Sequence, residues 1–141
     1  VVSKEGIIGF VIDVSDHYSI VKTVLSEDIN ISVKLKKNNE HWLLKWDGKD
    51  NKIAQLNGVT RDINIKEGDE IVTRGNKGMF PENQVVGTVK DIKSQDGKST
   101  LDVSIQLAVN FNAAYHVYVV KNILRNEQEK LEADLLSPDE Q

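Results

Sequence analysis

Apolar and polar residues alternate along most of this chain in short runs, which is the periodicity of β-strands. The clearest example runs from Leu101 to Leu107, where the apolar odd positions would face a core and the even positions water. Similar runs, rich in β-branched residues, are bounded by clusters of glycine, asparagine, aspartate and serine. They predict strands at residues 6–14, 20–25, 31–35, 41–46, 52–56, 85–93, 101–107 and 115–120.

Two turn signals indicate which of these strands pair. Asp47-Gly48 lies between the runs 41–46 and 52–56, and Asp96-Gly97 lies between the runs 85–93 and 101–107. An Asp-Gly pair favours a tight hairpin because glycine readily adopts a positive φ. The predicted fold is therefore all-β, with antiparallel strands in a small β-barrel or sandwich. A chain of 141 residues suits one domain of this kind, or two very small β subdomains.

The segment 65–89 combines short β-branched runs with glycines at four positions and a Phe80-Pro81 pair. Pro81 biases Phe80 towards an extended conformation, so we expect the aromatic ring at one end of a strand. The glycines suit tight turns. The segment contains no strong nucleophile and lacks the Gly-Lys-Ser/Thr ending of a phosphate-binding loop. It predicts part of a small barrel with one apolar loop, and a binding surface before a catalytic one.

The last twenty residues, 122–141, differ from the rest. From residue 122 to 136 there is no glycine or proline, and Leu124, Leu131 and Leu135 would lie near one face of a helix. The segment is also acidic. It predicts a short C-terminal helix that binds a partner or begins a coiled coil, or else a disordered tail, because a short isolated helix is marginally stable.

Charge and composition narrow the function classes. The net charge of −4 argues against nucleic-acid binding, which needs clustered lysine and arginine. The strongest basic run, Lys34 to Lys37, fits the solvent face or the edge of a strand. The absence of cysteine excludes disulfides and thiolate sites. No apolar run approaches the length of a membrane span, but the chain begins at Val1 in a strand-like run, so we interpret it as a fragment.

Candidate catalytic and metal-binding residues are few. His17, His41 and His116 are far apart, and none has a recognisable metal or catalytic spacing. A Ser-His-Asp triad could assemble from distant positions of a β-barrel, but no serine lies in a Gly-x-Ser-x-Gly or Gly-Asp-Ser-Gly context. We therefore expect no enzyme, no metal and no cofactor. A trypsin-like β-barrel hydrolase and an SH3-like or OB-like binding module stay open as alternatives.

The residues also carry a family resemblance. The stretch from Gly6 to Val21 resembles the Gly-x-Val-Gly strand and "Val-Ser-x-x-Tyr-Ser" turn of the rod-shape-determining protein MreC family. Residues 26–35 resemble the next strand pair of that family. Residues 65–75 resemble its "Val-Gly-Asp-x-Val-Val-Thr-Ser-Gly" motif, which is followed here by Gly-Met-Phe-Pro and Val-Gly-Thr-Val. The matches keep their order from about Val1 to Val120. The expected division is an MreC-like β region at 1–121 and a tail at 122–141.

The departures from the family pattern are local. The family usually reads Phe-Pro-x-Gly, whereas this chain has Asn83 at the last position, and asparagine tolerates the left-handed conformation. The segment around Trp42 and Trp46 matches less clearly. The resemblance also implies parts that this chain lacks: a cytoplasmic start, a transmembrane helix, a coiled coil and the opening β-strands.

The resemblance implies a non-enzymatic scaffold of the cell-elongation machinery, on the periplasmic face of the inner membrane. Its implied partners are the penicillin-binding transpeptidase of elongation, MreD, and MreB through a linkage to the cytoplasm. It also implies self-association as a dimer or filament, and in the intact family a pair of small β-barrels in a trypsin-like arrangement without catalytic residues. These partners would connect peptidoglycan synthesis to cell shape.

Three residues are candidates for partner binding: Tyr18, Met79 and Phe80. Each has two interpretations. Met79 or Phe80 would either close one end of a barrel or anchor in a groove of the partner, and Tyr18 would either cap its turn through the hydroxyl or contact a partner.

The variant Phe80→Ala separates the two interpretations of the aromatic loop. If Phe80 is an anchor, the substitution weakens transpeptidase binding by about 2 kcal/mol or more and leaves folding intact. If Phe80 belongs to the core, the free energy of unfolding falls by about 3–5 kcal/mol. Urea unfolding and a binding isotherm on the same preparation measure both quantities, and unchanged affinity in a folded variant would rule out the anchor.

Overall fold

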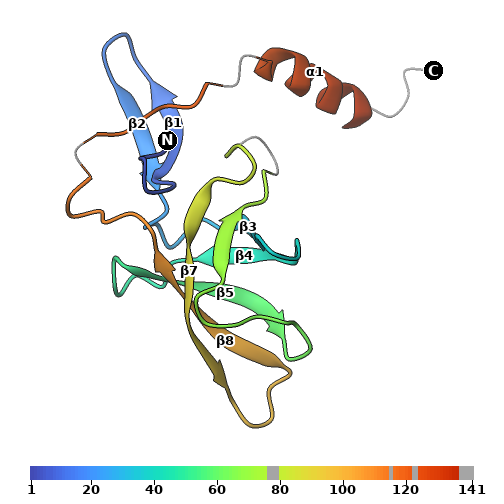
Figure 1. Ribbon diagram of the computed structural model, residues 1–141. Helices are drawn as coiled ribbons and strands as arrows, with labels where there is room; N and C mark the ends of the chain where they lie inside the picture. Colours follow the sequence, from blue (N-terminus) through green and yellow to red (C-terminus); the bar gives the residue numbers. More distant parts are fainter. Residues whose placement is uncertain (76–79, 115, 122–123, 137–141) are drawn as a thin grey trace.

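The computed structural model describes residues 1–75, 80–114, 116–121 and 124–136. In these ranges six strands form a closed antiparallel barrel, and two others form a hairpin beside it (Figure 1). Among the described residues there is also one helix, α1, near the C-terminus. The elements are β1 (Gly9–Val14), β2 (Ser19–Thr23), β3 (Ile31–Leu35), β4 (His41–Lys45), β5 (Ile53–Thr60), β6 (Glu70–Thr73), β7 (Val85–Ser94), β8 (Thr100–Leu107) and α1 (Arg125–Leu136). The predicted all-β antiparallel class is confirmed.

The barrel has the strand order β3-β4-β5-β8-β7-β6, and β6 pairs with β3 to close it. Four of the six pairings join strands that are neighbours in the sequence, while β5–β8 and β3–β6 join distant segments. In the closing pair, Val33 lies opposite Thr73 and Leu35 lies opposite Ile71. Closure leaves the barrel without a free edge that could pair with another chain.

Both predicted hairpins are present. Strands β4 and β5 are joined through Asp47-Gly48, where Gly48 has a φ of 82°, and the indole Nε1 of Trp46 donates to the carbonyl of Asp50 at 2.8 Å. Strands β7 and β8 pair across Asp96-Gly97. The alternation in β8 also has its expected consequence, because its inward positions Val103, Ile105 and Leu107 are buried.

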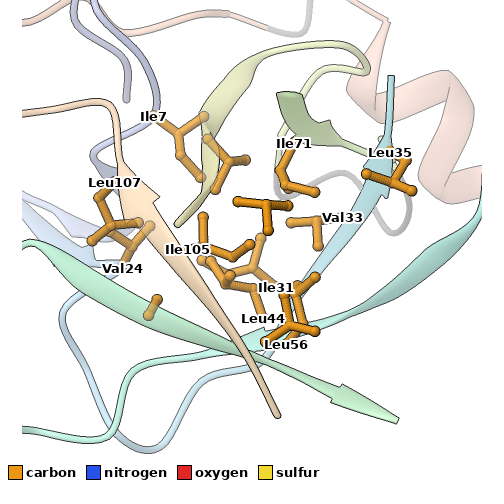
Figure 2. Close-up of a cluster of buried hydrophobic side chains, with 14 of the residues drawn as sticks. Ile7, Val24, Ile31, Val33, Leu35, Leu44, Leu56, Ile71, Ile105 and Leu107 are labelled. Carbon is orange, nitrogen blue, oxygen red and sulfur yellow. The ribbon is translucent and has the colours of Figure 1, made fainter. Parts of the chain in front are cut away.

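The core fills the barrel with aliphatic side chains from all six of its strands (Figure 2). Leu35, Leu44, Ile71 and Ile105 are among its largest fully buried members. Truncating a side chain of this kind to alanine costs about 2–5 kcal/mol, since it removes buried apolar area and leaves a cavity. The barrel is therefore the stable unit on which the other segments are mounted.

The hairpin β1–β2 is attached to the barrel at its base. The backbone N–H of Ile7 donates to the carbonyl of Val85 at 2.9 Å, and Ile7 and Val24 are part of the barrel core (Figure 2). The backbones approach so closely here that a Cβ on Gly6 would lie 2.6 Å from the carbonyl oxygen of Val85. Glycine is required at this junction because any side chain would push the hairpin off the barrel.

Thr73, at the end of β6, organises the loop that leads into β7. Its side chain is fully buried, and its Oγ1 donates to the carbonyl of Pro81 at 2.6 Å. The same oxygen accepts from the backbone N–H of Gln84 at 2.9 Å. Asn83, which precedes Gln84 in this turn, has a φ of 63°. This is a left-handed conformation, which asparagine tolerates better than most residues. One buried hydroxyl thus fixes both arms of the turn 81–84.

The lysine run 34–37 pairs with acidic residues of the segment 65–89. Lys34 Nζ lies 2.7 Å from Glu82 Oε1, and Lys36 and Lys37 pair with Glu70 and Asp69 at 3.2 and 2.7 Å. The prediction of a solvent-facing run is wrong for Lys34, which is buried. Its aliphatic stem lies against the closed barrel while its ammonium reaches Glu82, the way in which a long cationic side chain is accommodated at low exposure.

Two other predictions concern the C-terminal part. The strand predicted at 115–120 is wrong for its described residues, because only an isolated bridge between Tyr118 and Val2 is present, and residue 115 lies outside the described ranges. The tail contains the helix α1, one of the two forms predicted. Leu124, Leu131 and Leu135 are exposed, so these leucines are not packed onto the barrel.

The variant Thr73→Val tests the role of the buried hydroxyl. Valine has the same shape but leaves the Pro81 carbonyl and the Gln84 N–H without their partner, so we expect a loss of about 1–3 kcal/mol in the free energy of unfolding by urea. The matched control is Thr88→Val on the exposed face of β7, expected to change stability by less than about 0.5 kcal/mol. Equal effects of the two substitutions would contradict this role.

The pair Lys34–Glu82 predicts a pH-dependent contribution to stability. The Lys34 ammonium donates to Glu82 and holds the pKa of this carboxyl below its ordinary value of 4.5. A lowered pKa in the folded state gives stability that is present above 4.5 and is lost as the pH falls through the folded-state pKa. Glu82→Gln should therefore be less stable than the wild type at pH 7, with the difference vanishing in acid. Glu67→Gln is the control, and a difference that persists in acid would exclude the charge as its cause.

Candidate partner-binding surface

The hairpin β1–β2 exposes a group of large apolar side chains. Ile12, Val14, Tyr18 and Ile20 are 54%, 66%, 81% and 57% exposed, and we call these four the hairpin surface. Scattered apolar residues are common on protein surfaces, but several together on one small element indicate a contact site. A two-stranded hairpin has no second layer of its own to cover them.

Local structure explains why these side chains point outward. The pairing register of β1 and β2 shifts between Val11 and Asp13, which leaves Ile12 as the extra residue of a β-bulge. A bulge re-aims side chains and increases the local twist. At the turn, the N–H of Ser15 donates to the carbonyl of Tyr18 at 2.8 Å, and Ser15 Oγ accepts from the N–H of Tyr18 at 3.2 Å.

This turn leaves the Tyr18 side chain without a structural role. The turn is closed by the backbone of Tyr18 and by Ser15, and none of the described hydrogen bonds involves the Tyr18 hydroxyl. The capping role considered for that hydroxyl is therefore not seen. An exposed tyrosine presents an apolar ring with a polar tip, which is the combination favoured at protein interfaces.

A second exposed apolar segment runs beside the base of the hairpin. Val117, Tyr118, Val119 and Val120 are 49–65% exposed, and we call them the valine strip. Tyr118 exchanges two backbone hydrogen bonds with Val2, at 2.9 and 2.7 Å, and Val2 in turn bridges to Ile7. Figure 1 shows this segment passing the hairpin on its way to α1. The strip is thus joined to the N-terminal residues that precede the hairpin.

Charged groups border the hairpin surface. Asp13 and Asp16 are exposed near its tip, and Lys22 pairs with Asp28 near its base. The hydrogen bond from Lys22 lowers the pKa of Asp28. An apolar centre with a polar, solvated rim is the usual composition of a protein interface.

The three residues predicted for partner binding have different environments. Tyr18 is the most exposed member of the hairpin surface, whereas Phe80 is 6% exposed and belongs to the core. The Phe80 ring meets Phe10 of β1 edge-on, with centroids 6.2 Å apart and an interplanar angle of 90°. Burial therefore supports the interpretation in which Phe80 closes the barrel. Met79 lies outside the described residues.

Sequence reasoning missed Ile12, Val14 and Ile20 as surface residues. The clearest sequence signal for exposed apolar residues here is the loss of apolar–polar alternation in β1. Phe10, Val11 and Ile12 are three consecutive apolar residues. A strand with one buried face should alternate, so such a run indicates apolar groups on both faces. The bulge that turns Ile12 outward has no sequence signature in this run.

A hollow lies beside strands β4 and β5 of the barrel. It has a volume of about 500 Å³, and the buried Oε1 of Gln55 in its wall has no hydrogen-bond partner in the described structure. Its lining residues are Glu27, Lys45, Trp46, Asp47, Gln55 and Asn57. These lining residues include no serine, cysteine or histidine.

The described residues contain no cluster of three or more potential metal ligands. His17, His41 and His116 are exposed, and no hydrogen bond described for this chain joins a histidine to a serine. Within the same ranges, no helix has both the length and the apolar character needed to span a bilayer.

Known proteins resemble the chain in sequence and in fold. The family model "Rod shape-determining protein MreC, barrel core" matches residues 1–121. The cell shape-determining protein MreC of Listeria monocytogenes serovar 1/2a is 25% identical over 124 residues, which cover 86% of this chain and 42% of that protein. The chain thus spans less than half the length of this curated relative.

Two solved structures share the fold. The MreC crystal structure from Pseudomonas aeruginosa aligns with a TM-score of 0.73 at 24% identity, covering 79% of this chain and 71% of that one. A complex between Penicillin-Binding Protein (PBP2) and MreC from Helicobacter pylori contains a chain that aligns with a TM-score of 0.60 at 19% identity, covering 75% and 64%. Together with the closed barrel, the family match over residues 1–121 shows that this chain belongs to the family of the rod shape-determining protein MreC.

Proposed function

We propose that this chain is the partner-binding part of a non-enzymatic scaffold for cell elongation, and that its hairpin surface binds a penicillin-binding transpeptidase. The observation that carries the proposal is the exposure of Tyr18 and Ile20, at 81% and 57%, on a hairpin whose turn is stabilised by other groups. Their side chains are free for contact with a second protein. Membership of the cell shape-determining family gives the biological setting.

The solved complex of a relative supports the choice of partner. In that complex, MreC from Helicobacter pylori is bound to PBP2, and its chain has the fold of this one. We carry this partner class over to our chain as a proposal. An extracytoplasmic transpeptidase would meet the chain on the outer side of the inner membrane, so we propose a periplasmic location, with the parent protein anchored by a transmembrane helix.

The chemistry of the hairpin surface suits such a contact. Three aliphatic residues and one tyrosine make up the hairpin surface, and the strand pairing places Asp13 directly opposite Ile20. In interfaces of this type a few large central residues carry most of the binding energy, and the rim excludes water. Tyr18 is the expected anchor because an aromatic ring buries a large area at a small cost in rotamer entropy.

The wider assembly is also a proposal. We propose that the parent protein contacts MreD, and through it or a cytoplasmic segment the MreB filament, and that it self-associates as a dimer or filament. Residues 1–121 would be the binding region, and residues 122–141 an acidic tail beyond it. Leu131 and Leu135 of the tail are exposed, and we propose them for a further contact in the assembly.

Binding measurements with surface variants test the proposal. We expect Tyr18→Ala and Ile20→Ser each to weaken the affinity for the extracytoplasmic region of the transpeptidase from the same organism by about 2 kcal/mol, roughly thirtyfold. Surface plasmon resonance measures the affinity. Both positions are exposed, so the free energy of unfolding should change by less than about 0.5 kcal/mol.

The matched control is Leu43→Ser, which removes another exposed leucine-sized side chain, 45% exposed, from β4 on the barrel wall. It should leave the affinity unchanged. If Leu43→Ser weakened binding while the two hairpin variants did not, the transpeptidase would bind the barrel wall and the assignment of the hairpin surface would be wrong.

A further inference from the structure

The orientation of the hairpin depends on more than its base. Ile7 and Val24 attach the base of the hairpin to the barrel core. The hydrogen bond from Ile7 N–H to the Val85 carbonyl is also at this base, so it adds no contact farther along the hairpin. Contacts confined to one level of a two-stranded hairpin leave it free to tilt about that level. A fixed angle requires a second contact farther along the hairpin.

The pair Phe10–Phe80 provides this second contact. Phe10 lies on β1, beyond the base, and is partly buried, while Phe80 comes from the loop between β6 and β7. Their rings meet edge-on at 6.2 Å and 90°, a favourable geometry for two aromatic rings. The contact joins a strand of the two-stranded sheet to a loop of the barrel that is distant from it in the sequence.

The Phe80 side of this contact is held rigidly by the barrel. The residue after Phe80, Pro81, accepts a hydrogen bond from the buried hydroxyl of Thr73 at 2.6 Å, and Glu82 pairs with Lys34 of β3 at 2.7 Å. The two arms of the loop are also close together, since a Cβ on Gly75 would lie 2.7 Å from the Cβ of Glu82. Phe80 therefore adjoins a short segment, residues 81–84, that is bonded to strands β3 and β6.

We propose that Phe80 is a positioning residue: its edge-on contact with Phe10 sets the angle of the hairpin on the barrel. The hairpin surface is then presented to a partner in one orientation. A surface already held in its bound orientation does not lose that freedom on association, so its affinity is higher. The consequence for binding rests on the proposed function, whereas the geometric statement does not.

Distance measurements between the hairpin tip and the far end of the barrel test the geometric statement. The chain has no cysteine, so Asp16→Cys and Asp96→Cys introduce a unique pair of exposed sites for nitroxide labels. In the otherwise unchanged 141-residue chain, double electron–electron resonance should give one narrow distance distribution. With Phe80→Ala the distribution should widen to roughly twice its original width, and with Phe80→Leu by a smaller amount.

The control is Val59→Ala, which truncates a fully buried side chain of β5 and leaves the Phe10–Phe80 contact in place. It should lower the melting temperature but keep the distribution narrow. A narrow distribution in folded Phe80→Ala would overturn the proposal, as would equal widening by Val59→Ala, which would indicate general loosening. If Phe80→Ala does not fold, Phe80→Leu decides by the same criterion.

The affinity for the transpeptidase separates this inference from the proposed function. Phe80 itself is buried, yet Phe80→Leu should weaken binding. The loss of affinity should increase with the width of the distance distribution. If Tyr18→Ala and Ile20→Ser leave binding unchanged, the proposed function fails while the distance distributions still decide the role of Phe80. If both hairpin variants weaken binding and the distributions stay narrow, the proposed function stands and the positioning role fails.

Discussion

The pairing of β3 with β6 is the constraint on which the rest of this structure depends. It closes the barrel, buries Thr73 opposite Val33, and brings Lys34 within reach of Glu82. Neither strand would otherwise have a partner on that side, and two open edges would expose unpaired backbone groups to water and to other chains. The ion pairs of Lys36 and Lys37 with Glu70 and Asp69 cross the same seam.

Hydrogen bonding at this seam also shifts the pKa values of the carboxyl groups involved. Burial tends to raise the pKa of Asp69, but hydrogen bonds from the Lys37 side chain and the Lys66 backbone N–H outweigh it, so the pKa of this carboxyl is lowered. The hydrogen bond from the Lys34 ammonium lowers the pKa of Glu82 in the same way. Each exposed pair contributes little alone, but together the pairs favour the correct register of two strands that are distant in the sequence.

Much of the fold could be predicted from the sequence because it is encoded locally. The Asp-Gly turns place β4 against β5 and β7 against β8, and the alternation from Leu101 to Leu107 identifies the inward face of β8. The burial of Lys34 could not be predicted from the sequence. Its ammonium pairs with Glu82, which only the tertiary structure brings near. The segment 115–120 is β-branched and strand-like, but the barrel is already closed and offers it no edge.

The candidate surface was predictable only in part, for a related reason. Tyr18 was identified from its place in a turn, whereas the outward direction of Ile12 depends on a bulge set by pairing with β2. Phe80 has the same sequence context whether it is buried or exposed. The ring of Phe80 is covered because β1 lies beside this loop and Phe10 packs against that ring.

The Lys34–Glu82 pair joins residues 48 positions apart in the chain, and this separation has a consequence for the order of folding. Hairpins with short connections form quickly, while contacts between distant segments must first overcome the entropy of a large loop. We expect the β4–β5 and β7–β8 hairpins to form early and the β3–β6 seam late. The apolar hairpin would then reach its final angle only in molecules whose barrel is closed. Chains with an unclosed barrel would present the hairpin poorly and would bind the partner more weakly than folded chains.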